Sequence, residues 1–452
     1  MKRLWKFSLF LFVLLLVFSV SGFSKITITW WINPWRITPP GFPEGQTAGS
    51  EDYPKWASEE FMKLHPDVEV KYVVVGNKEY SQKMAAAIAT RTQPDLFKGP
   101  VWDSRWAKAG LLEPIDDFLT EEEWNDFYPK AIAEGEINGK HYILPWSFGT
   151  NGMGTSMLLY TPDFEKAGIN WKKIVREGWT MEEFLDACKK LTWDTDGDGE
   201  VDHYAFSLGA KDEHNVLNFI YAHGARLTNE DETKVTMDTP EAIEGLQFVV
   251  DLADKYGVIP DGVEAMGVYD VIGNFHSHRA SMGFGGPYEI GRITRYYLSK
   301  KWEFSEMFTP VLAPFPHVEG KDPVAYASSS GFVVFRQNDA KKREMVKEFA
   351  RFLVNQENMA LLESLSYLTA RESVNKTLYA DDEYMKEQVE TYAYIMDQYG
   401  LEFFGSQEFP YSQMKKFLIA AFEGAFSGTK TPEQALNDFV KEGDKILKKI
   451  KK

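Results

Sequence analysis

The chain has 452 residues, enough for two ordinary domains that each bury a hydrophobic core. It carries 50 basic and 67 acidic residues, and the net charge of −17 argues against nucleic acid or an anionic membrane surface as a partner. Aromatic residues make up 15% of the chain, so we expect some of them to line a binding surface rather than a core.

Residues 1–24 have the three-part pattern of a secretory signal peptide. Three basic side chains (Lys2, Arg3 and Lys6) precede the apolar run Phe7–Val20, and small residues follow as far as Ser24. A membrane anchor is the alternative, but a span needs about 20 apolar residues and this run is shorter. No cysteine follows the run to carry a lipid. We therefore expect a periplasmic or secreted protein without a lipid anchor.

The next segment alternates between strand and helix patterns. Expected strands are Ile26–Trp31, Val68–Val75 and Pro94–Phe97, and the helices Tyr53–Leu64 and Tyr80–Ala89 lie between them. This order predicts a parallel sheet wound by helices. A long loop rich in proline and glycine, residues 33–52, separates the first strand from the first helix, and loops of this length are usually functional or disordered.

The same alternation resumes in the second half of the chain, and from Lys341 the pattern is mostly helical. Neither an internal repeat nor a low-complexity linker separates the two halves. Two domains without a linker suggest several crossings between them, as a hinge requires. Expected strands are Tyr142–Leu144, Met157–Tyr160, Tyr204–Leu208, Ala280–Phe284 and Gly331–Phe335, and expected helices are Thr180–Leu191, His214–His223 and Pro240–Tyr256.

Four clusters that mix aromatic and polar residues follow expected strands. They begin at Trp30, Trp102, Pro145 and Gly285. Open α/β sheets bind ligands at the carboxyl ends of their strands, so the clusters are expected to meet at one cleft. Aromatic rings stack on the C–H faces of sugars while carboxylates, amides and guanidinium groups bind hydroxyls. For a single tryptophan an ordinary core position is the better interpretation, but recurrence at strand ends favours a sugar site.

The segment from Asp194 to Asp202 places acidic side chains at every second position, with glycines between them. Alternating oxygen ligands around a tight bend are typical of a loop that wraps Ca²⁺. The twelfth position is Ala205, so the glutamate that closes an EF-hand loop is missing. The alternative is a solvated acidic turn. The expected ligands of a structural Ca²⁺ are Asp194, Asp196, Asp198, Glu200 and Asp202.

Motifs for catalysis are scarce in this sequence. It contains no HExxH, no phosphate-binding GxxxxGK[ST] and no GxSxG. His276 and His278 are expected to be two surface histidines on a helix rather than a metal pair, and Cys188 a small buried residue. Asp103 and Glu289 could in principle act together as the carboxylates of a glycosidase.

The ordered landmarks of the chain resemble the extracellular solute-binding proteins of ATP-driven sugar importers, the maltose-binding-like family. The resemblance is carried by the segments 61–68, 94–97, 107–114, 138–145, 179–184, 282–288 and 349–353. It implies an α/β fold of two lobes joined by a hinge, the type II periplasmic-binding-protein fold, and a cleft that closes on a sugar. The resemblance also implies a hydroxyl-binding carboxylate at Asp103 and a stacking ring at Tyr288, where the family commonly has tryptophan.

The sequence thus predicts a monomeric, non-enzymatic carbohydrate-binding protein that passes its ligand to the permease subunits of an ABC importer. A secreted glycoside-active enzyme and a binding protein for another solute remain the alternatives. One lobe is expected to comprise residues 25–147 and 316–368, and the other 148–315 and 369–452. The expected stacking residues are Trp35, Trp102, Trp106, Trp146 and Tyr288, and the expected hydroxyl contacts are Asn33, Arg36, Asp103, Asn151, Glu289 and Arg371.

Overall fold

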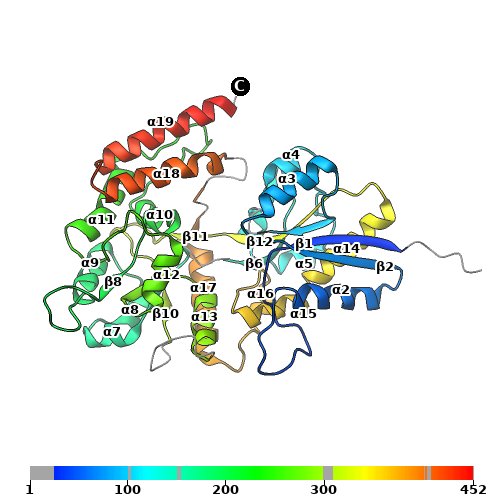
Figure 1. Ribbon diagram of the computed structural model, residues 1–452, viewed down its shortest axis with the longest axis horizontal. Coiled ribbons are helices and arrows are strands. Elements are labelled where there is room, and N and C mark those ends of the chain that lie inside the picture. Colours follow the sequence, from blue (N-terminus) through cyan, green and yellow to red (C-terminus); the bar gives the residue numbers. More distant parts are fainter. Residues whose placement is uncertain are drawn as a thin grey trace, which may run out of the picture.

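The computed structural model describes residues 25–99, 103–149, 154–298, 309–401, 403–404 and 409–450. The signal peptide expected at residues 1–24 lies outside this range, as do Trp102 and Asn151. Figure 1 shows two lobes side by side, each a sheet covered by helices. Within the described residues, no helix combines the length and the apolar composition that crossing a bilayer requires.

The first lobe is built on a five-stranded mixed sheet. Strands β1, β2 and β3 are parallel, and β12 is antiparallel to both β3 and β6. The sheet order is β2 (Val68–Val74), β1 (Ile26–Ile32), β3 (Leu96–Lys98), β12 (Ser329–Val334) and β6 (Leu144–Phe148). The strands expected before and after α2 are confirmed. Their β-branched residues favour extended backbone, and alternate residues of β1, such as Ile28 and Trp30, are completely buried.

Short and long helices surround this sheet. Apolar faces of α2 and α14 pack against it through Phe61, Phe349 and Leu353, which are buried in the same core as Trp30. The set comprises α2 (Asp52–Leu64), α3 (Tyr80–Thr90), α4 (Ser104–Lys108), α5 (Glu121–Asn125), α6 (Pro129–Ala133), α14 (Ala340–Leu353), α15 (Gln356–Ala360), the 3₁₀ helix Leu361–Leu365 and α16 (Glu372–Asn375). A small hairpin pairs β4 (Glu136–Ile137) with β5 (Lys140–His141).

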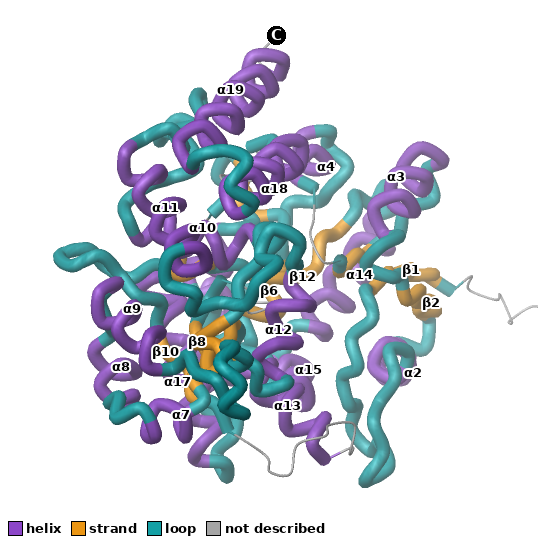
Figure 2. The backbone as a smooth tube through the Cα atoms, turned by 60° about the vertical axis from the view of Figure 1, so that its left-hand side comes forward, coloured by secondary structure: helices purple, strands orange, loops and turns teal. Residues whose placement is uncertain are grey.

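The second lobe contains a four-stranded sheet in the order β10 (Val311–Ala313), β7 (Met157–Leu159), β9 (Ala280–Phe284) and β8 (Tyr204–Phe206). Only β8 and β9 run parallel. Helices α18 and α19 lie together beside α11 at one end of this lobe (Figures 1 and 2). The helices are α7 (Thr161–Lys166), α8 (Trp171–Glu177), α9 (Met181–Lys190), α10 (Glu213–Ala222), α11 (Pro240–Asp254), α12 (Val268–His276), α13 (Pro287–Leu298), α18 (Tyr411–Phe426) and α19 (Pro432–Ile450).

The chain passes between the two sheets more than once, as a hinge requires. It leaves the first sheet between β6 and β7 and returns between β10 and β12. A further passage follows α17 (Glu383–Tyr399), which lies between the lobes in Figure 1. At its end β13 (Gly400–Leu401) pairs with β11 (Ala325–Tyr326). These passages agree with the absence of a separate linker in the sequence.

Tyr392 of α17 contacts the first passage between the lobes, where the chain leaves β6. Its hydroxyl donates to the Gly149 carbonyl at 2.7 Å, and its ring lies against Gly149 and Gly286. A Cβ atom at Gly286 would come within 2.8 Å of the ring, and Gly149 has φ of 69°, so both positions need glycine. The two lobes therefore approach each other closely at this tyrosine.

The predicted lobe boundary at residue 369 stays a prediction. Ala370 and Val374, expected in the second lobe, pack in the same core as β1. Leu158 of β7 and Leu312 of β10 also belong to that core, because α13 and α17 join the two sheets through their apolar faces. Apolar contact is thus continuous across the junction.

Candidate functional site

Three aromatic rings from different parts of the chain form a stack between the lobes. Trp35 follows β1, and its ring stacks on Tyr367 with centroids 4.8 Å apart and an interplanar angle of 25°. Tyr367 stacks in turn on Tyr288, at 5.2 Å and 10°. Tyr288 lies in the first turn of α13, directly after β9. Two of the rings predicted from the sequence therefore meet, but through Tyr367, which the sequence analysis did not select.

A buried lysine lies beside this stack. Lys98 is the last residue of β3, is 1% exposed, and places its Nζ 3.5 Å from the centre of the Trp35 ring. The same Nζ donates to Asn33 Oδ1 at 3.1 Å, and the Asn33 amide donates to Asn77 Oδ1 at 3.2 Å. Burial lowers the pKa of Lys98 well below its ordinary value. Asn33, which the sequence analysis selected, therefore bonds a lysine that it did not select. Lys98 could have been found by the same rule, because it is the last residue of a strand.

Trp146 has a different position from the one expected. The sequence analysis placed it after a strand at 142–144, whereas it lies inside β6 and is completely buried. Its ring packs against Tyr53, Trp35 and Phe332, at centroid distances of 5.8, 5.0 and 5.3 Å. The expected strand ended at Leu144, whereas β6 begins there and continues through Pro145, which an edge strand tolerates. Trp146 packs against the ring of Trp35 inside the core and has no exposed face that a ligand could contact.

Asp103 caps α4 and Trp106 lies on this helix, which follows β3 in the chain. Asp103 caps this helix by accepting from the Arg105 amide at 3.0 Å, and it binds the Arg105 guanidinium at 2.5 Å. Partial burial raises the pKa of Asp103, but the hydrogen bonds from Arg105 outweigh burial and hold it below its ordinary value. Trp106 is half-buried and packs on Phe97 and Phe335.

Glu289 follows Tyr288 and is buried in an ionic cluster. Its Oε2 lies 3.0 Å from His276 Nε2 and 3.1 Å from the Arg292 guanidinium. The prediction that His276 and His278 are surface residues of a helix was wrong. His276 ends α12 in a buried position, and His278 lies in a turn with φ of 53° next to Asp163. The sequence around these two histidines gave no sign that the helix ends at His276, before His278 is reached.

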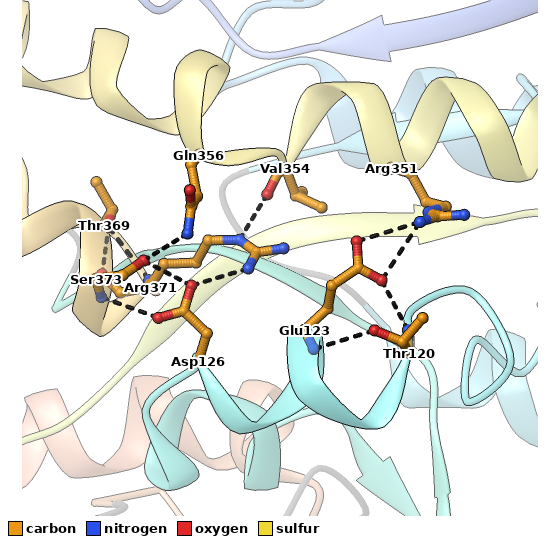
Figure 3. A network of polar contacts seen from close by, with 9 residues as sticks. All are labelled: Thr120, Glu123, Asp126, Arg351, Val354, Gln356, Thr369, Arg371 and Ser373. Carbon is orange, nitrogen blue, oxygen red and sulfur yellow. Dashed lines mark hydrogen bonds and ion pairs between the residues drawn. The ribbon is translucent and has the colours of Figure 1, made fainter.

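Arg371 belongs to a polar network inside the first lobe (Figure 3). Its guanidinium binds Asp126 at 2.9 Å and donates to the Val354 carbonyl at 2.8 Å, and it lies 4.4 Å from the centre of the Phe127 ring. Ser373 also donates to Asp126, at 2.7 Å. With 4% exposure, Arg371 holds α5, α14 and α16 together rather than facing solvent. Arg36, by contrast, is exposed on the loop after β1.

The start of α10 presents polar atoms that the sequence analysis did not select. Asp212 Oδ1, Asn215 Oδ1 and Asn218 Oδ1 are buried and have no hydrogen-bond partner in the described structure. Asn218 Nδ2 donates to the Gly154 carbonyl at 2.8 Å, which places α10 beside the first passage between the lobes. Burial raises the pKa of Asp212 to about 7. Buried acceptors of this kind call for a donor, and the run of polar residues after β8 was the signal for them.

The acidic loop after α9 folds around its own backbone. Asp194 accepts from the amides of Gly197 and Gly199 at 2.6 and 2.7 Å. Carboxylate oxygens of Asp194, Asp196 and Asp198 lie within 4.8 Å of one another. Both carboxylate oxygens of Asp202 are engaged by Thr195. The loop thus brings together three of the five expected ligands.

The glycosidase alternative required two free carboxylates. Asp103 is bound to Arg105 and Glu289 to Arg292 and His276, so each carboxylate already has a cationic or imidazole partner. Cys188 is completely buried, as expected, and burial raises the pKa of its thiol well above the ordinary value. It is therefore not an activated nucleophile.

Comparison with solved structures confirms the fold. A solute-binding protein of an ABC transporter from Thermotoga lettingae, solved with α-D-tagatose, superposes with a TM-score of 0.70. The match covers 94% of this chain and 100% of that one at 22% sequence identity. The maltose/maltodextrin-binding domain of Bdellovibrio bacteriovorus, bound to maltotriose, gives a TM-score of 0.67 at 19% identity, covering 94% and 100%. The chain therefore has the predicted two-lobed α/β fold of type II periplasmic binding proteins.

Sequence relatives match over a shorter length. A maltotriose-binding protein of Pyrococcus abyssi is 28% identical over 241 residues, which cover 52% of this chain and 46% of that protein. A mannitol-binding protein of Pseudomonas aeruginosa is 24% identical over 234 residues, half of each chain. The alignment thus spans about half the length of the curated relatives. A model of bacterial extracellular solute-binding proteins matches residues 45–360, and the chain belongs to this family.

Proposed function

We propose that this protein binds a carbohydrate between its two lobes as a monomer outside the cytoplasm and delivers it to the permease subunits of an ATP-driven importer. The ring stack of Trp35, Tyr367 and Tyr288 carries this proposal, because it joins aromatic side chains that follow β1 in one lobe and β9 in the other. Rings of this kind stack on the C–H faces of sugars. The named ligands of the relatives and structural neighbours, maltotriose, mannitol and tagatose, support the same ligand class.

Polar groups beside Trp35 in one lobe and at the start of α10 in the other suit a polyol. Lys98 and Asn33 supply donors and acceptors beside Trp35, and the unpaired acceptors at the start of α10 need hydroxyl donors. Centroid separations of 4.8 and 5.2 Å leave no room for a sugar between neighbouring rings. We infer that the lobes open at the passages near Tyr392, that the sugar enters against Trp35 or Tyr288, and that closure around it stabilises the closed population.

Isothermal titration with neutral mono- and oligosaccharides, including maltotriose and mannitol, tests the proposal. At least one sugar should bind the wild type, and Trp35→Ala should weaken that sugar at least tenfold because the stacking surface is lost. Trp171→Phe is the control, since Trp171 lies on α8 away from the stack and should leave affinity unchanged. Sugar binding that Trp35→Ala leaves intact, or no binding across the panel, contradicts the proposal.

We propose further that the bound sugar is released unchanged. The ion pairs of Asp103 with Arg105 and of Glu289 with Arg292 support this, because each keeps its carboxylate beside a cation. Prolonged incubation of the protein with the sugars that bind, followed by assay of reducing ends, tests the point. New reducing ends that disappear in Glu289→Gln would establish the glycosidase alternative instead.

The acidic loop is proposed to hold a structural Ca²⁺ through Asp194, Asp196 and Asp198, with Glu200 and Asp202 completing its shell. The convergence of the first three carboxylates supports the proposal. Calcium should raise the melting temperature after EDTA treatment, and Asp196→Asn should remove most of that shift. Asp381→Asn changes an exposed acid elsewhere and should keep the full shift. An EDTA-treated wild type that does not respond to calcium contradicts this site.

A further inference from the structure

A second cluster of potential metal ligands lies in the second lobe, away from the ring stack. Asp163 comes from α7, His203 precedes β8, and His278 stands in the turn between α12 and β9. Their ligand atoms all lie within 4.8 Å of one another. Asp163 Oδ2 is 2.9 Å from His278 Nε2 and 3.4 Å from His203 Nε2. Three separate elements thus direct one carboxylate and two imidazoles at a common point.

These separations fit a tetrahedral metal site. Zinc bonds of about 2.0–2.2 Å to nitrogen and oxygen place neighbouring donors roughly 3.3 Å apart. The observed distances of 2.9 and 3.4 Å from Asp163 to the two imidazoles lie on either side of this value, and the ligand nitrogens of the two imidazoles lie within 4.8 Å of each other. Two histidines and one carboxylate are also the set that catalytic zinc sites use, with the fourth position left to water or another ligand.

The surroundings of the cluster hold its ligands in place. The Trp193 ring stacks on His203 at 4.0 Å and 11°, and Tyr160 meets the His278 ring edge-on at 4.4 Å. Ser281 donates to Asp163 at 2.7 Å and lies 2.8 Å from His203 Nε2. The ring contacts restrain both imidazoles, whereas the Ser281 hydroxyl bonds the Asp163 and His203 atoms that would hold the ion, so it would rotate away when metal binds.

Exposure and charge indicate how an ion would enter. The side chains of Asp163 and His203 are 7% and 4% exposed, whereas His278 is 31% exposed. The open side of the cluster therefore faces solvent at His278. Lys166, over the Trp193 ring at 4.4 Å, is a nearby cation that would weaken binding without blocking it. One carboxylate with two neutral imidazoles suits a borderline metal rather than Ca²⁺, which prefers oxygen ligands.

We propose that Asp163, His203 and His278 form a zinc-binding site with its fourth position open to solvent beside His278. The ion would tie α7, the end of the acidic loop and the start of β9 together. This site is independent of the proposed sugar site, so a protein that binds sugar without zinc, or zinc without sugar, separates the two proposals.

Titration of tag-free protein with ZnCl₂ against a chromophoric chelator tests the site. Excess calcium is present to occupy the acidic loop. The wild type should bind one zinc ion, and zinc should raise its melting temperature. His278→Asn should lower the zinc affinity at least tenfold, and asparagine suits this position because it tolerates the positive φ of 53°. His141→Asn is the control, since His141 lies in the other lobe beside Asp116, at 2.8 Å, and Trp124, and its loss should leave zinc affinity unchanged.

Cobalt gives a second measurement that needs no variant. Co²⁺ in a tetrahedral site of the wild type should show visible absorption that zinc displaces and calcium does not. No zinc binding by the calcium-saturated wild type overturns the proposal, because the cluster is then a hydrogen-bonded network only. Zinc binding that His278→Asn leaves unchanged also overturns it, because the ion then binds elsewhere.

Discussion

Lys98 and Arg371 are both buried cations, but their environments differ. Arg371 has a carboxylate partner in Asp126 and a backbone partner in Val354. Lys98 has only the Asn33 amide oxygen and the faces of two tryptophans, and no ion pair involving it exists among the described residues. A buried ion pair is typical of a scaffold, whereas a buried amine without a carboxylate is more often kept for binding.

Replacing Arg371 should test its structural role. Arg371→Ala leaves Asp126 without its buried cation, and breaking such a pair costs about 3–5 kcal/mol. Arg351→Ala is the matched control in the same network (Figure 3), because Arg351 and Glu123 are each about one-third exposed at 3.2 Å. Exposed pairs contribute only about 0–1 kcal/mol. Urea unfolding measures both, and equal losses would place Arg371 outside the scaffold.

Lys98→Met should weaken sugar binding while leaving stability nearly unchanged, the reverse of what is expected for Arg371→Ala. Methionine keeps the apolar contact with Trp35 but removes the donor to Asn33, so the free energy of unfolding should change by about 1 kcal/mol or less. The affinity for the sugar identified by titration should fall at least tenfold. Loss of stability with unchanged sugar affinity would show that Lys98 serves the fold alone.

At the scale of elements, helix caps determine where several helices begin. Thr180 and Glu183 form a capping box at α9, with reciprocal bonds of 2.9 and 3.1 Å to each other's backbone amides. The sequence analysis expected this helix to begin at Thr180, within one residue of its observed start, and threonine followed three residues later by glutamate is the local signal that fixes that start. The box also brings Glu183 within 2.9 Å of Lys173 of α8.

Removal of this cap should be measurable. Thr180→Ala should lower the free energy of unfolding by about 1 kcal/mol, because one of the first amides of α9 loses its acceptor. Thr90→Ala is the control, since the exposed Thr90 hydroxyl bonds carbonyls of its own helix and the Thr92 hydroxyl but caps no helix amide, and its loss should cost within about 0.5 kcal/mol. Equal effects in thermal or urea unfolding would contradict the assigned role of the cap.

At the scale of the whole molecule, the junction between the lobes carries buried ionisable groups. Asp212 stands at the start of α10, near the first passage, with Asn215 donating to it at 2.6 Å. Glu213 and His214 follow it, and Lys415 of α18 binds Glu213. Burial is the main cause that raises the pKa of Asp212 to about 7, Asn215 and Lys415 oppose it, and Glu213 adds to it. Burial also lowers the pKa of His214 to about 4.

The raised pKa of Asp212 predicts a pH dependence of stability. In the unfolded chain aspartate titrates near 3.9, so between about pH 4 and 7 the folded protein holds an additional proton. Stability from this group is complete below about pH 4 and is lost as the pH rises through 7. Relative to Asp212→Asn, the wild type should lose on the order of 4 kcal/mol across this window, because each unit of the roughly three-unit difference in pKa corresponds to about 1.4 kcal/mol.

Urea unfolding at a series of pH values measures this difference. Asp261→Asn, a change of an exposed acid in the same lobe, should follow the wild type at every pH. A constant difference between Asp212→Asn and the wild type from pH 4 to 8 would mean that the carboxyl group of Asp212 is already ionised at low pH.

Local pattern was enough to determine much of this protein. Alternation in β1 and β2 and the helical pattern of α9 each depend on residues a few positions apart, so these elements were correctly predicted. The rule that ligands bind at strand ends selected Asn33, Trp35 and Tyr288, which the structure brings to one region. Order and spacing of landmarks along the chain similarly anticipated the family, which the matched model then confirmed.

Only the tertiary structure decided which partners meet. Tyr367 lies 332 positions from Trp35 but stacks directly on it, and the pairings of Arg371 with Asp126 and of His278 with Asp163 span 245 and 115 positions. Trp146 became a support within the core because β6 continues through Pro145 as an edge strand. Sequence pattern reports backbone preference over one or two turns, whereas contacts between distant side chains depend on how whole elements pack, and no local pattern encodes that.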